Sequence, residues 1–171
     1  MKDYIPLKTL DYYHPVSFKE ESYDIISKGQ ILCPCSCKDF SIRYKGDLRK
    51  GLFGQVSLHA LDENDLGISL TCNECGKSLI LFDIKTDGYD AVIEENLSPV
   101  NSSHVELQTL LCPKCQKGQY FVNVKYAHYP KTETDEDGIQ DYKNAFQWIW
   151  VDLECSSCSK KFKNFVDIET A

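Results

Sequence analysis

The sequence is poor in the features that mark membrane-spanning and secreted proteins. No apolar run approaches the roughly 20 residues that a transmembrane helix needs. Residues 1–6 lack the apolar stretch of a signal peptide. Because disulfide frameworks belong to oxidising compartments, the nine cysteines of this chain indicate reduced, metal-bound thiols. We therefore expect a cytoplasmic protein.

A recognisable catalytic constellation is also missing. The four histidines are scattered along the chain, and no two have the spacing that would place them on one helix face. No cysteine has a neighbouring base in a pattern typical of an activated nucleophile. These absences predict that the protein is not an enzyme.

Basic residues are fewer than acidic residues in this chain. The chain has 19 Lys and Arg against 26 Asp and Glu, a formal net charge of −7 at pH 7. Metal ions held by four thiolates each would make the charge more negative, because one divalent cation does not neutralise four thiolates. Such a field repels nucleic-acid phosphates and favours a protein partner with a basic surface.

Cysteine pairs are the dominant feature that is present. Cys112 and Cys115 form one C-x-x-C pair, and Cys155 and Cys158 form a second pair further along. Each pair lets two thiolates converge on one ion, and a second pair across a hairpin completes a tetrahedron. The spacing predicts a structural zinc ion, with iron as the main rival because it accepts the same ligands.

An earlier group repeats this arrangement with one cysteine too many. Cys72 and Cys75 form a C-x-x-C pair, but Cys33, Cys35 and Cys37 offer three sulfurs where two are needed. Because the Leu-Cys-Pro context of Cys33 recurs in the later group, we predict Cys33 as a ligand, with Cys37 as its mate and Cys35 as the alternative. The spare thiol is either inert or a redox-sensing thiolate. A second structural zinc ion is expected here.

The segments between the cysteine pairs have the pattern of β-strands. Apolar and polar residues alternate over 40–45 and 120–126, which is the period of a half-buried strand. Apolar runs over 146–153 and 162–168 supply further strands, and the nearly continuous run over 79–84 predicts a strand covered on both faces. We predict a mainly β protein made of two tandem zinc ribbons of antiparallel strands.

The N-terminal segment has two interpretations. Ser17 and Glu20 form a capping-box pattern that predicts a short helix through Ile25 and Ile26, ended by Gly29. The alternative is an edge strand added to the first ribbon. The predicted organisation is an N-terminal segment over 1–30, a first ribbon over 31–84, a linker over 85–109 and a second ribbon over 110–171.

In general form the paired cysteine turns resemble the zinc-ribbon families, and the resemblance covers most of the chain. The second ribbon, which ends in residues 164–171, is similar to small uncharacterised bacterial zinc-ribbon proteins, some of which lie beside toxin genes. The zinc-ribbon fold serves many unrelated functions, so the resemblance implies fold and metal content and leaves the activity open.

Two surface features predict partner binding. Phe146, Trp148 and Trp150 should share the face opposite the ribbon core, where either the rest of the chain covers them or they form an exposed anchor. An acidic segment should form a hairpin tip that docks on a cationic partner. Its carboxylates are those of Glu133, Asp135, Glu136 and Asp137. A calcium loop is disfavoured, because Asn144 stands where such a loop needs a bidentate glutamate.

These features together favour a non-catalytic protein-binding module. Its most concrete form would be an immunity protein or antitoxin-like inhibitor of another protein. The alternative is a nucleic-acid-associated accessory protein that uses the basic patch from Arg43 to Lys50. The cations of that region are Lys38, Arg43, Lys45, Arg49 and Lys50.

Overall fold

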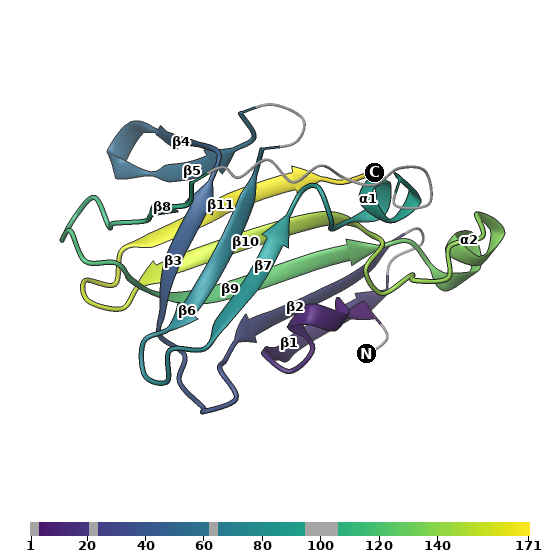
Figure 1. Cartoon of the computed structure of the whole chain (residues 1–171), viewed down its shortest axis with the longest axis horizontal. Coiled ribbons are helices and arrows are strands. Elements are labelled where there is room, and N and C mark those ends of the chain that lie inside the picture. The colour runs from purple at the N-terminus through teal and green to yellow at the C-terminus, as the bar shows by residue number, and fades with distance from the viewer. Residues whose placement is uncertain (1–3, 21–23, 62–64, 95–105) are drawn as a thin grey trace.

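The computed structural model describes residues 4–20, 24–61, 65–94 and 106–171 (Figure 1). The prediction of a mainly β fold is confirmed, since the helical segments are single short turns. The elements in chain order are η2 (Leu7–Thr9), β1 (Tyr13–Glu20), β2 (Ile25–Ile31), β3 (Phe40–Lys45), β4 (Asp47–Lys50), η3 (Leu52–Gly54), β5 (Val56–His59), β6 (Gly67–Cys72), β7 (Ser78–Asp83), α1 (Tyr89–Glu94), β8 (Gln108–Thr109), β9 (Gln119–His128), α2 (Lys131–Glu136), β10 (Phe146–Cys155) and β11 (Lys161–Glu169).

The larger layer is built around β9. This strand pairs antiparallel with β10 on one side and with β2 on the other, and β11 and β1 extend the layer at its two edges. β9 and β10 have ten residues each, and their alternate side chains point to a buried inner face and a half-buried outer face. The period-two pattern of the sequence therefore correctly marked these strands.

The smaller layer consists of β3, β6 and β7, which cross in front of β9, β10 and β11 in Figure 1. The two layers meet where β3 and β9 begin, at the cross-strand pairs Phe40–Tyr120 and Ser41–Gln119. Their inner faces form one hydrophobic core, in which the rings of Phe82 and Phe146 lie 6.1 Å apart. A single core thus joins both ribbons.

The two ribbons repeat the same strand register. Phe40 lies opposite Cys72 in the first ribbon, as Tyr120 lies opposite Cys155 in the second. The pairs that follow along the strands also correspond, and in both ribbons the pairing of the last two strands is shifted by a bulge. This equivalence agrees with a duplicated ribbon unit.

The N-terminal segment corrects the predicted helix. Ser17 and Glu20 lie in β1, and Ile25 begins β2, so the described part of this region is a hairpin. Gly29 does not end a helix. It lies in β2, where a Cβ atom would meet the ring of Tyr13 at 2.5 Å, so only glycine leaves room for that ring. The hairpin also joins the second ribbon through β9, not the first ribbon as the edge-strand alternative supposed.

Strand β7 corrects a second expectation. Leu79, Leu81 and Phe82 are buried, but the side chain of Ile80 is 58% exposed. β7 is the edge strand of the smaller layer, and only its inner face is covered. The nearly continuous apolar run arises from the bulge beside Ile68, which brings two consecutive residues to the inner face.

Candidate metal centres

The second ribbon brings its four predicted cysteines together. Cys112 and Cys115 precede β9, and Cys155 and Cys158 lie at the turn from β10 to β11. Their sulfur atoms all lie within 4.8 Å of one another. Cys112 Sγ is 3.7 Å from Cys158 Sγ, and Cys115 Sγ is 3.5 Å from Cys155 Sγ. The four thiols therefore surround a common point.

We call each turn that carries a cysteine pair a knuckle. In the knuckle that begins at Cys112, the N–H of Gln116 donates to the carbonyl of Cys112, and the N–H of Cys112 donates to the carbonyl of Lys117. Gln116 has a φ of 59°. The same two backbone bonds and a positive φ recur in the knuckles that begin at Cys72 and Cys155.

The knuckle backbone also prepares the thiols to ionise. The N–H of Lys160 points at Cys158 Sγ and lowers the pKa of that thiol to about 7. Burial acts in the opposite direction at Cys155, where it raises the pKa of the thiol. A cation at the centre favours the thiolate form of every ligand and so overcomes that burial cost.

The first ribbon gathers Cys33, Cys35, Cys72 and Cys75, and all four sulfurs lie within 4.8 Å of one another. Cys33 Sγ is 3.4 Å from Cys75 Sγ, and Cys35 Sγ is 3.6 Å from Cys72 Sγ. Cys35, the alternative ligand, therefore belongs to the group, and Cys37, the ligand that the sequence predicted, lies outside it. Cys37 Sγ instead accepts a hydrogen bond from the N–H of Asp39 at 3.4 Å.

Cys35 is the second ligand because the knuckle that begins at Cys33 is one residue shorter than the other three knuckles. Here the N–H of Ser36 donates to the carbonyl of Cys33, and the N–H of Cys33 donates to the carbonyl of Cys37. Ser36 has a φ of 72° and so corresponds to Gln116. Cys35 then occupies the position of Cys115, the second ligand of its knuckle.

Cys37 takes the place that a lysine holds in the other knuckles. The residue after each positive-φ position is Lys77, Lys117 or Lys160 in the three longer knuckles and Cys37 in the short one. The thrice-repeated pattern C-x-x-C-x-K was a signal in the sequence that would have separated the ligand from the spare thiol. Sequence reasoning missed it because it counted the spacing between cysteines alone.

Asp39 connects the two centres, and nothing in the sequence motifs pointed to it. Its carbonyl accepts a hydrogen bond from the N–H of Asn73 at 3.1 Å, in the first centre. Its carboxylate accepts a hydrogen bond from Ser156 Oγ at 3.2 Å, in the second centre. Ser41 Oγ also donates to Asn73 at 2.5 Å. One residue therefore ties a knuckle of each centre to the other.

Both groups fit a tetrahedral metal ion. In a regular tetrahedron with metal–sulfur distances of about 2.3 Å, the sulfurs lie about 3.8 Å apart. The sulfur–sulfur distances of 3.4 to 3.7 Å given above are close to that separation. Each group supplies four thiols and no oxygen or nitrogen ligand, a donor set that suits zinc or iron. Two metal ions could therefore be held.

The tryptophans predicted for partner binding lie on the outer face of β10. The rings of Trp148 and Trp150 stack with centroids 5.4 Å apart and planes 11° from parallel. The ammonium of Lys125 lies 3.4 Å from the Trp150 ring centroid, and Trp148 Nε1 donates to the carboxylate of Asp167 at 2.7 Å. Both tryptophans are half-buried, and Lys125 and Asp167 on the same face hold them.

Phe146 does not share this face, which corrects its predicted position. A bulge in the pairing of β9 and β10 falls between Phe146 and Trp148, so Phe146 turns into the core. Its ring packs against Tyr126 and His128 and is 1% exposed. It cannot contact a partner in the folded chain.

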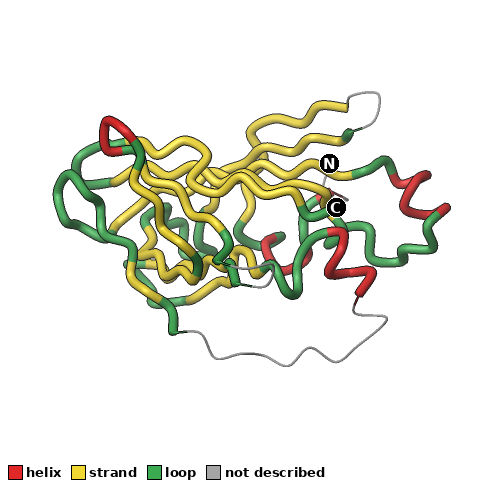
Figure 2. Tube along the Cα trace, turned by 90° about the horizontal axis from the view of Figure 1, so that it is seen from above, coloured by secondary structure: helices red, strands yellow, loops and turns green. Residues whose placement is uncertain are grey.

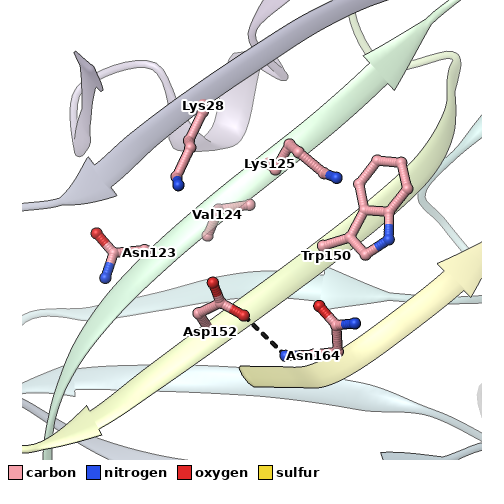
Figure 3. A pocket seen from close by; sticks show the side chains of 7 residues that line it. All are labelled: Lys28, Asn123, Val124, Lys125, Trp150, Asp152 and Asn164. Atoms are coloured by element: carbon pink, nitrogen blue, oxygen red, sulfur yellow. Dashed lines mark hydrogen bonds between the residues drawn. The ribbon is translucent and has the colours of Figure 1, made fainter. Parts of the chain in front are cut away.

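A cavity of about 100 Å³ lies beside the tryptophans on the same outer face (Figure 3). Its polar lining comes from four strands. The carboxylate of Asp152 accepts a hydrogen bond from the N–H of Asn164 at 2.7 Å, which closes the bulge of β11. The other lining residues are Lys28, Asn123, Val124, Lys125 and Trp150. Two pairs of lining residues therefore already bind each other, Asp152 with Asn164 and Lys125 with Trp150.

The acidic segment forms helix α2 and not a hairpin tip. Glu133, Asp135 and Glu136 are exposed on it, and Asp137 follows it and accepts a hydrogen bond from Tyr89 Oη at 2.5 Å. This contact raises the pKa of Tyr89 to about 12. Among the described residues, only the two cysteine groups bring three or more candidate metal ligands together, so α2 does not form a calcium site there.

The basic patch predicted from Arg43 to Lys50 is divided. Lys45 Nζ binds the carboxylate of Asp83 at 2.9 Å. Arg49 and Lys50 lie on the separate β4–β5 hairpin, where Arg49 Nε binds Asp47 at 2.8 Å. Tyr44, the aromatic residue expected among these cations, is buried.

Comparison of the chain with protein-family models, with curated proteins and with solved structures finds no match. Within the described part of the chain, the longest helices have six residues, and none could cross a bilayer.

Proposed function

We propose that both centres hold structural zinc and that the chain is a non-catalytic module that binds another protein. The observation that carries this proposal is the stacked pair of Trp148 and Trp150 on the open outer face of the larger layer. Tryptophan is the residue that most often dominates binding energy at protein interfaces.

The neighbours of the pair support a binding role. Lys125 and Asp167 hold the two rings in place, so that little side-chain freedom remains to be lost when a partner covers them. The same contacts argue against catalysis at this face. Lys125, Asp152 and Asp167 already bind a ring, a backbone N–H and an indole N–H, so these three groups are not placed as a general acid or base.

The charge near the tryptophans favours a partner with a basic surface. Glu169 lies directly opposite Trp148 on β11. The exposed carboxylates of α2 lie at the end of the molecule where β9 stops and β10 starts. An acidic rim around aromatic anchors steers a basic partner and speeds its association. The most concrete form of this function is an inhibitor of the immunity-protein or antitoxin kind.

Co-purification with the product of the adjacent gene tests the proposal. We expect a stoichiometric complex whose dissociation constant rises about 30-fold or more in Trp150→Ala, the cost of losing one anchor. Ile80→Ala removes an exposed apolar side chain from the other layer and should leave the complex unchanged. If Trp150→Ala and Ile80→Ala weakened the complex equally, the assignment of the binding surface to the tryptophans would be contradicted. Salt-sensitive gel shifts with RNA or DNA, without a protein partner, would support the nucleic-acid alternative instead.

Elemental analysis of the purified chain tests the metal. Zinc at close to two atoms per chain is expected, one for each cysteine group. Iron at that level would produce the strong visible absorbance of iron–thiolate centres and would replace zinc in the proposal.

A further inference from the structure

The charges of the molecule are separated between its two ends. Helices α1 and α2 and both termini lie toward one end of the long axis, and the acidic residues of α2 are exposed there (Figures 1 and 2). The β4–β5 hairpin and the knuckles of the second metal centre lie at the opposite end. We call this opposite end the basic end.

Three segments build the basic end, residues 48–61, 110–122 and 155–166, and none contains an Asp or Glu. They come together in space, since Val56, Pro113 and Phe162, one from each segment, line a common hollow. Seven cations lie on them. These are Arg49, Lys50, Lys114, Lys117, Lys160, Lys161 and Lys163. Within the described part of the chain, two of these seven cations form ion pairs, Arg49 with Asp47 and Lys161 with Glu154, whose carboxylates lie just outside the segments.

The apex of this end is apolar. Leu52 is 82% exposed and Phe53 is 93% exposed, at the tip of the β4–β5 hairpin. Gly51 and Gly54 flank them, so neither chain neighbour of the pair carries a polar side chain. Figure 2 shows this short helical turn near one end of the chain trace. Two large apolar side chains exposed together at the apex of a hairpin form an apolar patch, and such a patch marks an interaction site.

The tip is held in its conformation. Phe53 has a φ of 59°, a left-handed backbone that a bulky side chain rarely adopts. Lys160 Nζ, from a knuckle of the second metal centre, donates to the carbonyl of Phe53 at 3.1 Å. The hairpin closes below the tip, where the N–H of Gly51 donates to the carbonyl of Gln55 at 2.9 Å. The metal centre thus helps to present the ring to solvent.

From these observations we infer that the basic end binds an anionic lipid surface, with Leu52 and Phe53 inserted among the headgroups. Apolar side chains at an apex, with cations set behind them, match the depth profile of a membrane interface. Single-stranded nucleic acid would instead require aromatic rings lying within a cationic groove. Among the described residues of the basic end, Phe53 is the one exposed ring, and its side chain is 93% exposed.

The size of the electrostatic effect is modest. Each lysine or arginine near an anionic leaflet strengthens binding about fivefold. Four thiolates around one divalent ion carry a charge of about −2, so the second metal centre offsets part of this attraction. Cations alone would therefore bind weakly and reversibly, and the apolar tip is needed for retention.

Co-sedimentation of the full, metal-loaded chain with vesicles tests the inference. Vesicles of phosphatidylcholine with phosphatidylserine should retain the protein in a salt-sensitive manner, and vesicles of phosphatidylcholine alone should not. The double variant Leu52→Ser/Phe53→Ser should bind at least about tenfold more weakly. The matched control Val16→Ser/Ile80→Ser, which changes two apolar side chains exposed elsewhere, should bind as the unmodified chain does.

Single charge changes complete the test. Lys50→Gln at the basic end should weaken vesicle binding about fivefold, whereas Lys131→Gln on α2 should not change it. Unchanged metal content in every variant shows that the fold survives. Absence of binding to anionic vesicles, or equal binding by the Leu52→Ser/Phe53→Ser variant, overturns the inference. Tighter binding to a single-stranded oligonucleotide than to vesicles, lost in the same variant, assigns the surface to nucleic acid instead.

Discussion

The two metal centres share one strand register but differ in how the rest of the chain protects them. In the second centre Cys112 and Cys155 are buried, Cys115 and Cys158 are half-buried, and the strands continue into the middle of the larger layer. In the first centre Cys35 and Cys75 are exposed. The knuckles that begin at Cys72 and Cys155 have the same backbone hydrogen bonds, yet Cys75 is exposed and Cys158 is half-buried, so the protection of these two thiols depends on the tertiary environment.

The difference has a structural cause. β9 is covered on both sides by β2 and β10, and β9 and β10 have ten residues each. β3 and β6 have six residues each, and β7 leaves the smaller layer with an open edge. The strands attached to the second centre are longer and continue through the core, whereas the first centre lies at the margin of that core.

Loss of a buried ligand of the second centre should have the largest effect. Cys155→Ser removes a metal ligand that also lies in the core, and structural zinc contributes on the order of 10 kcal/mol, comparable to the whole stability of a domain. We expect this variant to be unfolded. Cys75→Ser, at an exposed ligand of the first centre, should lose one metal ion and melt earlier but keep its β-sheet circular dichroism.

Thermal melts measure the stability of these two variants, and elemental analysis measures their metal content. Equal destabilisation by Cys155→Ser and Cys75→Ser would show that both centres support the fold equally.

The ligand choice within the first centre gives the next largest effect. Cys35→Ser should lower the metal content by one ion per chain, because Cys35 belongs to the sulfur group. Cys37→Ser should retain both ions and change stability by less than about 1 kcal/mol, since Cys37 is half-buried, its thiol bonds the backbone of Asp39, and a serine keeps the backbone bond from Cys33. Elemental analysis of the two proteins decides the matter, and loss of metal in Cys37→Ser alone would reverse the assignment.

The end of the second ribbon far from the metal should make stability depend on pH. His128 is buried, and burial lowers its pKa to about 4, while its Nε2 lies 3.2 Å from the carbonyl of Lys143. The unfolded chain, with an ordinary histidine pKa of about 6.5, binds a proton more readily. Stability is therefore complete above about pH 6.5 and is lost as pH falls toward 4, with about 1 kcal/mol gone at pH 5.5.

Urea unfolding at pH 7.5 and 5.5 measures this dependence. His128→Gln keeps an N–H donor for Lys143 and has no titrating group, so its loss of stability between the two pH values should be smaller. The thiolates of both centres titrate alike in the two proteins, and the comparison cancels them. An identical pH dependence in both proteins would contradict the assignment.

The smallest effect should come from making the second ribbon resemble the first. Tyr120 and Phe40 occupy equivalent positions and are both fully buried, and Tyr120 Oη has no hydrogen-bond partner among the described residues. Tyr120→Phe removes an unpaired buried hydroxyl and should be neutral or stabilise the protein by up to about 1 kcal/mol. A clear destabilisation in urea titrations would indicate a partner for that hydroxyl, such as a bound water.

Several elements of the fold could be predicted from local patterns. The alternation over Phe40–Lys45 and Gln119–His128 marked strands correctly, because side chains of a strand alternate between two faces wherever one face is buried. The cysteine pairs were brought together as expected, because a C-x-x-C turn directs two sulfurs to one side. The ligand choice in the short knuckle was not predicted, because the spacing between cysteines does not distinguish Cys35 from Cys37, whereas the backbone hydrogen bonds place Cys37 after the positive-φ residue Ser36.

By itself the sequence determined the ribbon strands and the positions of the two metal centres, because spacing and alternation act through neighbours along the chain. Only the tertiary structure decided that β1 and β2 join β9 and that a bulge turns Phe146 inward while Trp148 and Trp150 face outward. It also decided that cations from three separate segments meet behind Leu52 and Phe53. These outcomes depend on pairing between distant residues, and a single extra residue in a strand reverses which face a side chain occupies.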